Sequence, residues 1–475
     1  MVMSIENRVI ELFRMISAVP RPSYHEEKIA DFICDFAKQN GLLPYRDAVN
    51  NVLVNVPATK GYEDHAAVVL QGHTDMVCEK NEGVEHDFMS EGIKIIEENG
   101  WLTADGTTLG ADNGVAVAIM LYVIEGGIKA HPPVQCLFTV SEEVGLDGAK
   151  AFDYGKLYAR RLLNMDAENM EKVIVGCAGG LRSNVTFEPD YGEYNGKALE
   201  IRISGLYGGH SGENIASGRA NANILMGRLL GEIAEKTEFS LVSLRGGSKD
   251  NAIPREAVAL IAPENIDAVI EIARVFEKEM AVELSYDDRG FKLDTRTVDA
   301  PLRVMDKKTT KAVISLICSV KNGIIEMSKK LSGLVEYSRN LGVITTDEKK
   351  LTLVFSSRSA IDRQLDAAIR EIDMLASLCG ASAEHYNRYP GWAYAGESDM
   401  ADAYIAVCKS LYGTDVEKEI IHAGLECGII KSYVPDMDCI SCGPNMRDLH
   451  SPDEAVEIES FGKYARAVEA LLGAL

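Results

Sequence analysis

The spacing of apolar residues at the start of the chain predicts two helices. Apolar side chains recur at the interval of one helix face from Ile5 to Ile16, and the pattern stops before "VPRPS". Ser23 and Glu26 then have the spacing of a capping box. A second helix is therefore expected to begin there and to end at Gly41, a residue type common at helix ends.

Short runs that are apolar throughout follow these helices and alternate with helical stretches such as "DNGVAVAIMLYVIEGG". The runs are "NVLVNV", "AAVVLQ", "VQCLFTV" and "RLLNM". Strands that are apolar on both faces and alternate with helices are typical of an α/β fold, with a mainly parallel sheet covered by helices on both faces. Ligands of such folds bind where the strands end.

A different rhythm begins after the polar, glycine-containing stretch at residues 188–198. The order strand, helix, strand, strand, helix, strand occurs twice. Its strands are predicted at "LEIRIS", "FSLVSL", "AVALIA" and "AVELSY", and again at "FKLDTRTV", "LVEYSRN", "KLTLVFSS" and "SAEHYN". This pattern predicts an inserted, duplicated α+β (βαββαβ) domain at 193–386, with halves at 193–289 and 290–386. The α/β domain that the insert interrupts is then expected in two segments, 1–192 and 387–475.

Charge and composition narrow the classes of partner. The chain is 46% hydrophobic and 25% charged, which is typical of globular proteins, and its net charge of -23 disfavours nucleic acid and anionic membranes. Neither a signal peptide nor an apolar run of about 20 residues is visible. The ten cysteines are scattered, and the lone CxxC at Cys439 and Cys442 reads as part of a strand. A cytoplasmic location is expected.

Side chains that bind metals stand at the ends of the apolar runs or at the start of a helix. The segments are "GHTD", "LGADNG", "TVSEEVG", "LNMDAE" and "MRDLHS". Each segment alone has an ordinary interpretation: a surface histidine, a helix N-cap or solvated loop charges. Together they provide His73, Asp75, Asp112, Glu142, Glu143, Asp166 and His450.

Their joint placement favours a metal centre. Carboxylates crowded at one sheet edge repel one another and raise one another's pKa, so a site without a cation would be costly. A pair of divalent ions removes this cost. One bridging carboxylate, with one further carboxylate and one imidazole for each ion, makes a reasonable zinc site, and manganese or cobalt fits the same ligands.

The ordered motifs "GHTDMV", "GADNG", "SEEVG", "NMDAE", "GGHSG" and a late "HS" resemble those of the M20 family of dinuclear zinc peptidases. Within that family the chain is most similar to the aminoacyl-histidine dipeptidase branch, over nearly its whole length. The resemblance implies hydrolysis of dipeptides, including the β-alanyl-histidine type. An N-acyl amino acid deacylase or a tripeptidase of the same fold is the alternative. A binding protein without catalysis is disfavoured because the base and all ligands are present, and no GxGxxG motif supports dinucleotide binding.

The resemblance also implies a role for each metal-site residue. His73 and Asp166 would bind one Zn²⁺, Glu143 and His450 the other, and Asp112 would bridge the two. The Asp112–Asn113 peptide bond would be cis.

Three further residues match catalytic positions of the family. Glu142 would be the general acid and base, and Asp75 would orient the imidazole of His73. His210, in "GLYGGHSGENI", would donate to the developing oxyanion, although the glycines around it also suit a simple turn.

The remaining matches concern the substrate, which would be a small dipeptide. Asn251 would hydrogen-bond to it, and Arg358 would bind its C-terminal carboxylate with a planar guanidinium. "IHAGLECGII", with His422, Gly424 and Glu426, lies where the family lines its specificity pocket. Glu426 would hold the free amino group, with a buried structural role as the alternative. The resemblance also implies that the inserted domain, 193–386, is a lid and that the interrupted domain is the catalytic domain. A doubled lid would supply His210, Asn251 and Arg358 within one chain, and a homodimer is also compatible with the sequence.

Overall fold

The computed structural model describes residues 4–299, 302–329, 331 and 333–475. The chain divides into two compact units. The first comprises 1–177, 392–421 and 425–475, and the second comprises 178–391 and 422–424. No helix in the described part of the chain has both the length and the apolar character needed to cross a membrane.

The first unit is built on an eight-stranded sheet in the order β1-β2-β6-β3-β7-β23-β8-β22. Its strands are β1 (Pro44–Arg46), β2 (Val52–Val56), β3 (Val68–His73), β6 (Val134–Thr139), β7 (Arg161–Asn164), β8 (Lys172–Cys177), β22 (Glu417–Ile421) and β23 (Asp438–Ser441). β3 pairs in parallel with β6 and β7, and β23 with β7, so the centre of the sheet is parallel. The four apolar runs of the first segment form β2, β3, β6 and β7, as predicted.

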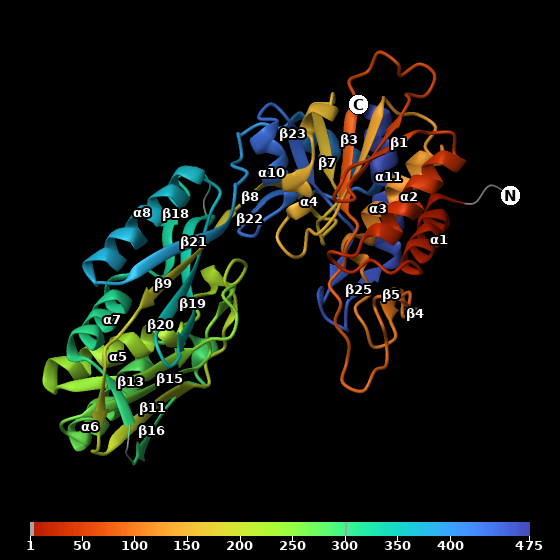
Figure 1. Cartoon of the computed structure of the whole chain (residues 1–475). Coiled ribbons are helices and arrows are strands. Elements are labelled where there is room, and N and C mark those ends of the chain that lie inside the picture. The colour runs from red at the N-terminus through yellow and green to blue at the C-terminus, as the bar shows by residue number, and fades with distance from the viewer. Residues whose placement is uncertain (1–3, 300–301, 330, 332) are drawn as a thin grey trace. The chain divides into compact units, whose positions relative to one another are not determined.

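Helices cover both faces of this sheet (Figure 1). They are α1 (Ile5–Ser17), α2 (Glu27–Gln39), α3 (Ala111–Ile124), α4 (Asp147–Ala151), α9 (Asp399–Tyr412), α10 (Glu426–Tyr433) and α11 (Ile458–Ala474). α1, α3, α9 and α11 share one apolar core with the strands, and α4 packs against α10. α3 is buried on almost all sides, which explains why its sequence is apolar throughout. A small separate sheet contains β4 (Ile95–Glu98), β5 (Trp101–Ala104), β24 (Met446–Arg447) and β25 (Ala455–Glu457).

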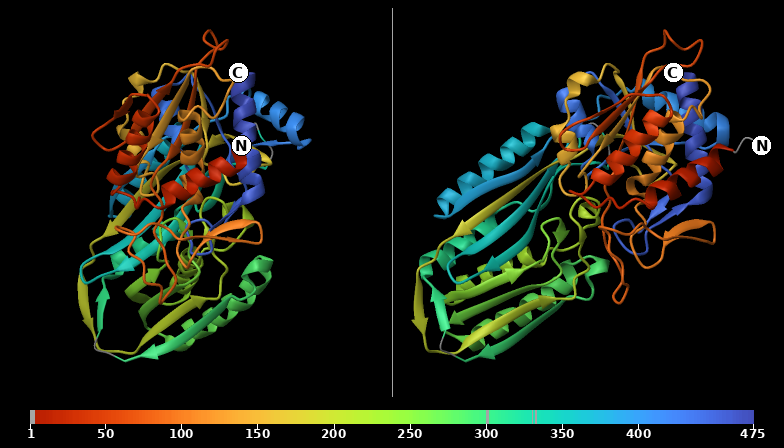
Figure 2. Two further views of the ribbon diagram at one scale, coloured as in Figure 1. Left: turned by 90° about the vertical axis from the view of Figure 1, so that its right-hand side faces the viewer. Right: turned by 45° about the vertical axis from the view of Figure 1, so that its right-hand side comes forward.

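The second unit contains a long antiparallel sheet in the order β16-β11-β15-β13-β19-β20-β9-β21, with β18 paired to β19. Its strands are β9 (Gly179–Phe187), β11 (Ala198–Ser204), β13 (Phe239–Gly246), β15 (Ala257–Pro263), β16 (Lys292–Val298), β18 (Gly323–Met327), β19 (Val335–Thr346), β20 (Leu351–Ser359) and β21 (Ser382–Tyr389). The helices α5 (Ala222–Lys236), α6 (Ile266–Glu283), α7 (Lys307–Ser319) and α8 (Asp362–Leu378) lie along one face of it (Figures 1 and 2). Two short pairs complete the unit: β10 (Tyr191–Tyr194) with β17 (Leu302–Met305), and β12 (Gly209–His210) with β14 (Ala252–Ile253).

The strand order differs from the predicted succession of two halves. "FKLDTRTV" forms β16, which pairs with β11 and so lies beside a strand of the predicted first half, although it was expected to open the second. "AVELSY" is not a strand, because α6 continues to Glu283. β9, which the sequence pattern did not predict, pairs with both β20 and β21. The unit therefore begins at Ala178, before the expected residue 193, and the elements β11 to β16 lie between β9 and α7 in the sequence.

Candidate metal and active site

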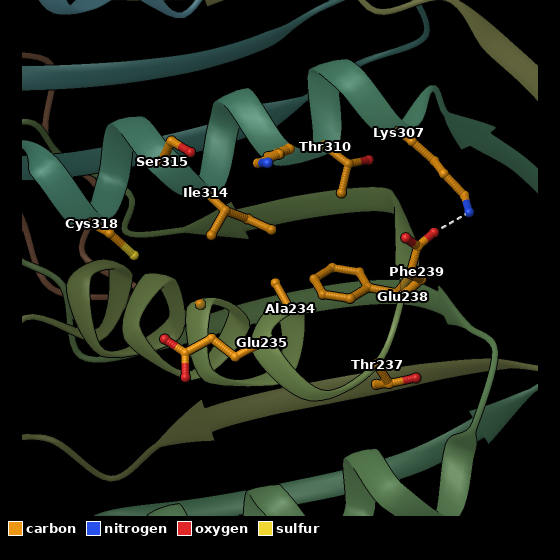
Figure 3. A pocket seen from close by; sticks show the side chains of 12 residues that line it. Ala234, Glu235, Thr237, Glu238, Phe239, Lys307, Thr310, Ile314, Ser315 and Cys318 are labelled. Atoms are coloured by element: carbon orange, nitrogen blue, oxygen red, sulfur yellow. Dashed lines mark hydrogen bonds and ion pairs between the residues drawn. The ribbon is translucent and has the colours of Figure 1, made fainter.

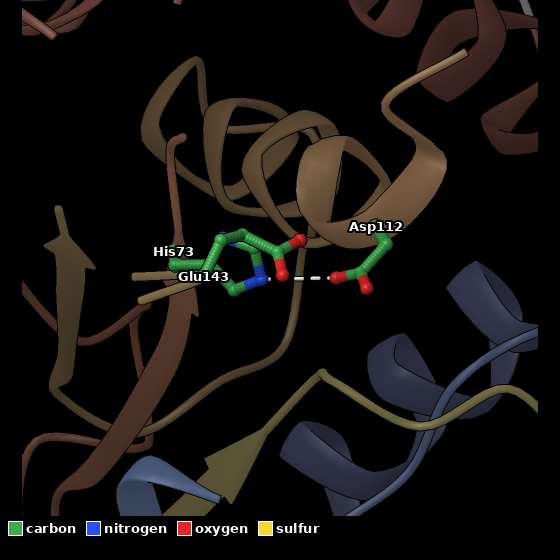
Figure 4. A group of neighbouring side chains, drawn as sticks. All are labelled: His73, Asp112 and Glu143. Carbon is green, nitrogen blue, oxygen red and sulfur yellow. Dashed lines mark hydrogen bonds and ion pairs between the residues drawn. The ribbon is translucent and has the colours of Figure 1, made fainter. Parts of the chain in front are cut away.

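Five ligand-type side chains of the first unit meet at the carboxyl edge of its parallel strands. His73 is the last residue of β3, Glu143 follows β6, and Asp166 follows β7. Asp112 lies in the first turn of α3, and His450 lies between β24 and β25. Ligand atoms of His73, Asp112 and Glu143 all lie within 4.8 Å of one another, and their side chains converge in Figure 4.

Asp112 lies between two histidines. Its Oδ1 is 2.9 Å from Nε2 of His73, and its Oδ2 is 3.2 Å from Nε2 of His450. Each histidine also faces a second carboxylate: His73 Nε2 is 3.6 Å from Asp166 Oδ1, and His450 Nε2 is 3.1 Å from Glu143 Oε2. The side chains thus form two groups of one imidazole and one carboxylate, with Asp112 common to both.

The charges of this cluster are strongly coupled. Burial and the charge of Asp112 raise the pKa of Glu143 and of Asp166 above their usual ranges. Burial opposes the ionisation of Asp112, but hydrogen bonds with His450 and His73 lower its pKa. Hydrogen bonds with Asp112 and Glu143 raise the pKa of His450 to about 11.

The donor set fits a pair of divalent cations. Imidazole nitrogens and carboxylate oxygens are the ligands that Zn²⁺, Mn²⁺ and Co²⁺ accept. The buried Oε1 of Glu143 has no hydrogen-bond partner among the described residues, although buried polar atoms normally have one. Cations would satisfy this oxygen and neutralise the crowded carboxylates.

Asp75 links the cluster to the turn that carries the two glutamates. It is fully buried, and its Oδ1 is 3.3 Å from Nδ1 of His73. It also accepts hydrogen bonds from the backbone N–H groups of Glu142 (3.0 Å) and Glu143 (3.3 Å). The hydroxyl of Ser23 donates to its Oδ2 (2.8 Å). Asp75 therefore fixes the His73 ring and the Glu142–Glu143 turn together.

The predicted capping box of Ser23 and Glu26 is wrong. α2 begins at Glu27 without a side-chain cap. Ser23 donates to Asp75 instead, and the buried Glu26 accepts hydrogen bonds from the backbone N–H and hydroxyl of Ser141 (2.8 and 2.7 Å). Ser23 and Glu26 therefore form hydrogen bonds with Asp75 and Ser141, which are distant in sequence, and do not cap the helix.

Two buried residues that sequence reasoning did not identify hold the loops of the site. Glu454 accepts hydrogen bonds from the backbone N–H groups of Leu109 (2.8 Å), Gly110 (2.9 Å), Ala111 (2.8 Å) and Asp112 (3.3 Å). Arg21 donates to the carbonyls of Thr74 (3.0 Å), Asp75 (3.2 Å) and Gly110. Their partners are backbone groups distant in sequence, so the only available signal was that Glu454 lies four residues after His450, and Arg21 had none.

The peptide bond between Asp112 and Asn113 is cis, as the resemblance implied. The side-chain amide of Asn113 donates to the carbonyl of Met165 (3.0 Å) and to Oδ1 of Asp166. Asn113 thereby links α3, which carries Asp112, to the segment after β7, which carries Asp166.

Glu426 begins α10 and is fully buried in the first unit. Its Oε2 accepts hydrogen bonds from Gln71 and from the hydroxyl of Thr139 (2.7 Å), and Asn164 donates to Gln71 (2.7 Å). Oε1 has no hydrogen-bond partner among the described residues. Burial raises the pKa of Glu426 to about 7. Glu426 therefore forms a polar network with Gln71 of β3, the strand that ends in His73, and one oxygen of its carboxylate has no partner in this network.

We expect Glu426→Gln to stabilise the metal-free protein at alkaline pH. The folded state holds the Glu426 proton up to a higher pH than the unfolded state, so wild-type stability falls as pH rises from about 4.5 to 7. The amide cannot ionise, and the variant should gain about 2–3 kcal/mol above pH 7, with the gain vanishing below about pH 4.5. Thermal unfolding at pH 5 and pH 8 with a chelator measures this, with the exposed Glu417→Gln as control. An equal shift at both values would contradict it.

The other predicted substrate residues lie in the second unit. β12 pairs with β14 so that His210 is opposite Ala252, and the Ser211 N–H donates to the carbonyl of Asn251 (2.8 Å). Nη2 of Arg358 is 3.4 Å from Nε2 of His210. Asn251, His210 and Arg358 are thus held in one unit by backbone pairing and a side-chain contact.

His422 and Gly424 also belong to the second unit, although their neighbours in sequence belong to the first. Nε2 of His422 lies 2.7 Å from the hydroxyl of Ser338. Burial, followed by the charges of Arg358 and His210, lowers the pKa of His422 to about 3, so the ring is neutral. His422 and Gly424 thus belong to the second unit, whereas Glu426 belongs to the first.

A hollow of about 510 Å³ lies between α5 and α7 in the second unit (Figure 3). Lys307 and Glu238 form an ion pair at one end, and Cys318 lies at the other. None of the predicted site residues lines it. The hollow therefore adds nothing to the chemistry of the site.

Comparisons with known proteins identify the family of the chain. The family described as "Peptidase family M20/M25/M40" matches residues 69–474. The cytosol non-specific dipeptidase of Escherichia coli is 37% identical over 466 residues, which cover 97% of this chain and 96% of that protein. The structure of aminoacylhistidine dipeptidase from Vibrio alginolyticus superposes with a TM-score of 0.90 at 37% identity, over 100% of this chain and 98% of the other.

A more distant structure shares the fold alone. Aminopeptidase PepT from Bacillus cereus has a TM-score of 0.57 at 16% identity, over 98% of each chain. The family match and the two relatives at 37% identity extend over most of the chain, and the residues of the family match, 69–474, span all five ligand-type side chains. The chain belongs to peptidase family M20/M25/M40.

Proposed function

We propose that this protein is a cytoplasmic dipeptidase that uses two Zn²⁺ ions and hydrolyses dipeptides, including the β-alanyl-histidine type. The observation that carries the proposal is the position of Asp112 between His73 and His450, each of which faces a second carboxylate. The relatives at 37% identity, which are named as dipeptidases, support the choice of substrate class.

His73 and Asp166 would hold one ion, Glu143 and His450 the other, and Asp112 would bind both. Manganese or cobalt would suit the same ligands. When bound, such a pair lowers the pKa of a water molecule to near neutrality and polarises the carbonyl of the substrate.

Glu142 is the proposed general base and acid. It lies on the same turn as Glu143, and Asp75 holds the backbone of both residues. A carboxylate here would take a proton from the attacking water and then donate it to the leaving amine. Asp75 would assist by fixing the tautomer of His73, because its carboxylate lies against Nδ1 of that ring.

The second unit would supply the groups that recognise the substrate. His210 is the proposed donor to the carbonyl oxygen as negative charge develops on it. Arg358 is the proposed partner of the C-terminal carboxylate, and Asn251 is a hydrogen-bonding partner. Arg358 suits this role because only 5% of it is exposed and its buried Nε has no hydrogen-bond partner among the described residues.

Glu426 is proposed to bind the free amino group of the dipeptide, and its unsatisfied Oε1 supports this role. His422 and Gly424 are proposed to line the specificity pocket. In this proposal the second unit is a duplicated lid. Apart from the additional strands β10, β12, β14, β17 and β18, each half has the order strand, helix, strand, strand, helix, strand once β9 is counted with the second half.

A panel of substrates tests the function. We expect the metal-loaded protein to cleave dipeptides, β-alanyl-histidine included, with kcat/KM at least roughly 100-fold above that for tripeptides and N-acetyl amino acids. N-acetyl amino acids are disfavoured because they lack the free amino group that Glu426 would bind, and the preference over tripeptides follows from the relatives at 37% identity, which are named as dipeptidases. Turnover confined to acetylated substrates would identify a deacylase instead, and a preference for tripeptides would identify a tripeptidase.

A further inference from the structure

A row of paired residues crosses the sheet of the second unit at Arg358. Tyr389 of β21 pairs with Gly180 of β9, Gly180 pairs with Arg358 of β20, and Arg358 pairs with Ser338 of β19. Directly paired residues of antiparallel strands project from the same face of a sheet. Tyr389, Arg358 and Ser338 therefore project from one face, with a glycine between the first two.

Because Gly180 has no side chain, the ring of Tyr389 can lie over this residue and contact Arg358. A Cβ at Gly180 would collide with ring atoms and the hydroxyl of Tyr389. Because the ring lies over Gly180 of the intervening strand β9, the hydroxyl meets the Arg358 side chain there and accepts a hydrogen bond from its Nη1 (3.3 Å). The pairing register shifts between Tyr386 and Tyr389, where Asn387 has φ 47°, and such irregularities redirect side chains beside functional sites.

A segment distant in sequence holds the ring from the other side. A Cβ at Gly424 would lie 2.8 Å from Cε2 of Tyr389. The segment is anchored where the Ala178 N–H donates to the carbonyl of Ala423 (3.0 Å) and where His422 contacts Ser338. The ring of Tyr389 thus lies between two glycines that are both backed by fixed backbone.

Arg358 itself is incompletely satisfied. It is 5% exposed and contacts Tyr389 and His210, yet its buried Nε has no hydrogen-bond partner among the described residues. A buried guanidinium without an anion is costly, and a carboxylate that bound it in the fork geometry would remove this cost.

We propose that Tyr389 is a positioning residue, seated between Gly180 and Gly424, that orients Arg358 for the C-terminal carboxylate of the substrate. The inference rests on the proposed dipeptidase function and adds a specificity determinant to it. By fixing Nη1, the hydroxyl sets the plane of the guanidinium so that its other N–H groups are presented to the ligand.

Tyr389→Phe keeps the ring and removes only the hydrogen-bond acceptor. We expect its KM for β-alanyl-histidine to rise roughly tenfold, with kcat changed less than about twofold, because an oriented charged hydrogen bond is lost in ground state and transition state alike. The C-terminal amide of the same dipeptide lacks the carboxylate, so its hydrolysis should be equal in variant and wild type. Gly424→Ala, which displaces the ring, should reproduce the selective loss.

Tyr386→Phe is the matched control, because this hydroxyl on the same strand donates to Asn184 and does not contact Arg358. A Tyr389→Phe effect of equal size on dipeptide and amide, or none on either, would overturn the inference. The wild type in the same assay reports separately on the proposed function. Should it hydrolyse neither substrate, thermal-shift titration of the metal-loaded protein with dipeptide and amide still decides: equal affinity of Tyr389→Phe and wild type for the dipeptide would refute the role of Tyr389.

Discussion

Glu142→Gln should leave metal binding intact and lower kcat by roughly 10²–10⁴-fold. Glu142 is not among the side chains that contact the two histidines at their Nε2 atoms, so the amide should not disturb the ligand set. Its loss removes the group that would accept the proton of the attacking water. Burial, together with the charges of Asp166 and Glu143, raises the pKa of Glu142 well above its usual range, as suits a group that must both accept and return a proton.

The neighbouring Glu143→Gln provides the matched comparison. Glu143 contacts His450 at 3.1 Å and is a proposed ligand, so this variant should lose metal as well as activity. Metal content by atomic spectroscopy and kcat from steady-state kinetics separate the two effects. Activity of Glu142→Gln within about tenfold of wild type, at full metal content, would remove Glu142 from the mechanism.

The residues at the strand ends were predictable because of a property of parallel sheets. β3, β6 and β7 are adjacent and parallel, so the residues after each strand necessarily meet at one edge. That rule alone places His73, Glu143 and Asp166 together. Asp112 and His450 required the family motifs, because nothing in their local pattern indicates which loop they approach.

Side chains whose partners are backbone groups escaped prediction. Glu454 binds four consecutive N–H groups and Arg21 three carbonyls, and the sequence does not show which distant backbone groups a charged side chain will contact.

The strands of the second unit were also predicted incompletely. "AVELSY" alternates like a strand, but α6 extends into it, since short apolar runs fit either period. β9 was assigned to no half because its partners β20 and β21 follow much later in the chain.

Asp112→Ala should abolish activity and reduce the bound metal from two ions to fewer than one per chain. Each oxygen of Asp112 faces a different histidine, so its removal takes one ligand from both proposed positions at once. His450→Ala takes a ligand from one position only, and this variant should retain about one ion per chain.

The two variants also separate a bridging role from a structural one. Asp112 raises the pKa of Glu143 and of Asp166, so in the metal-free protein Asp112→Ala relieves repulsion between carboxylates while it leaves two imidazoles without their partner. These changes oppose each other, and the melting temperature in the presence of a chelator should move little. Addition of Zn²⁺ should then raise the melting temperature of wild type strongly, of His450→Ala partly, and of Asp112→Ala least, because only ions that bind the folded state stabilise it. Equal stabilisation of the two variants would show that the ions do not share Asp112.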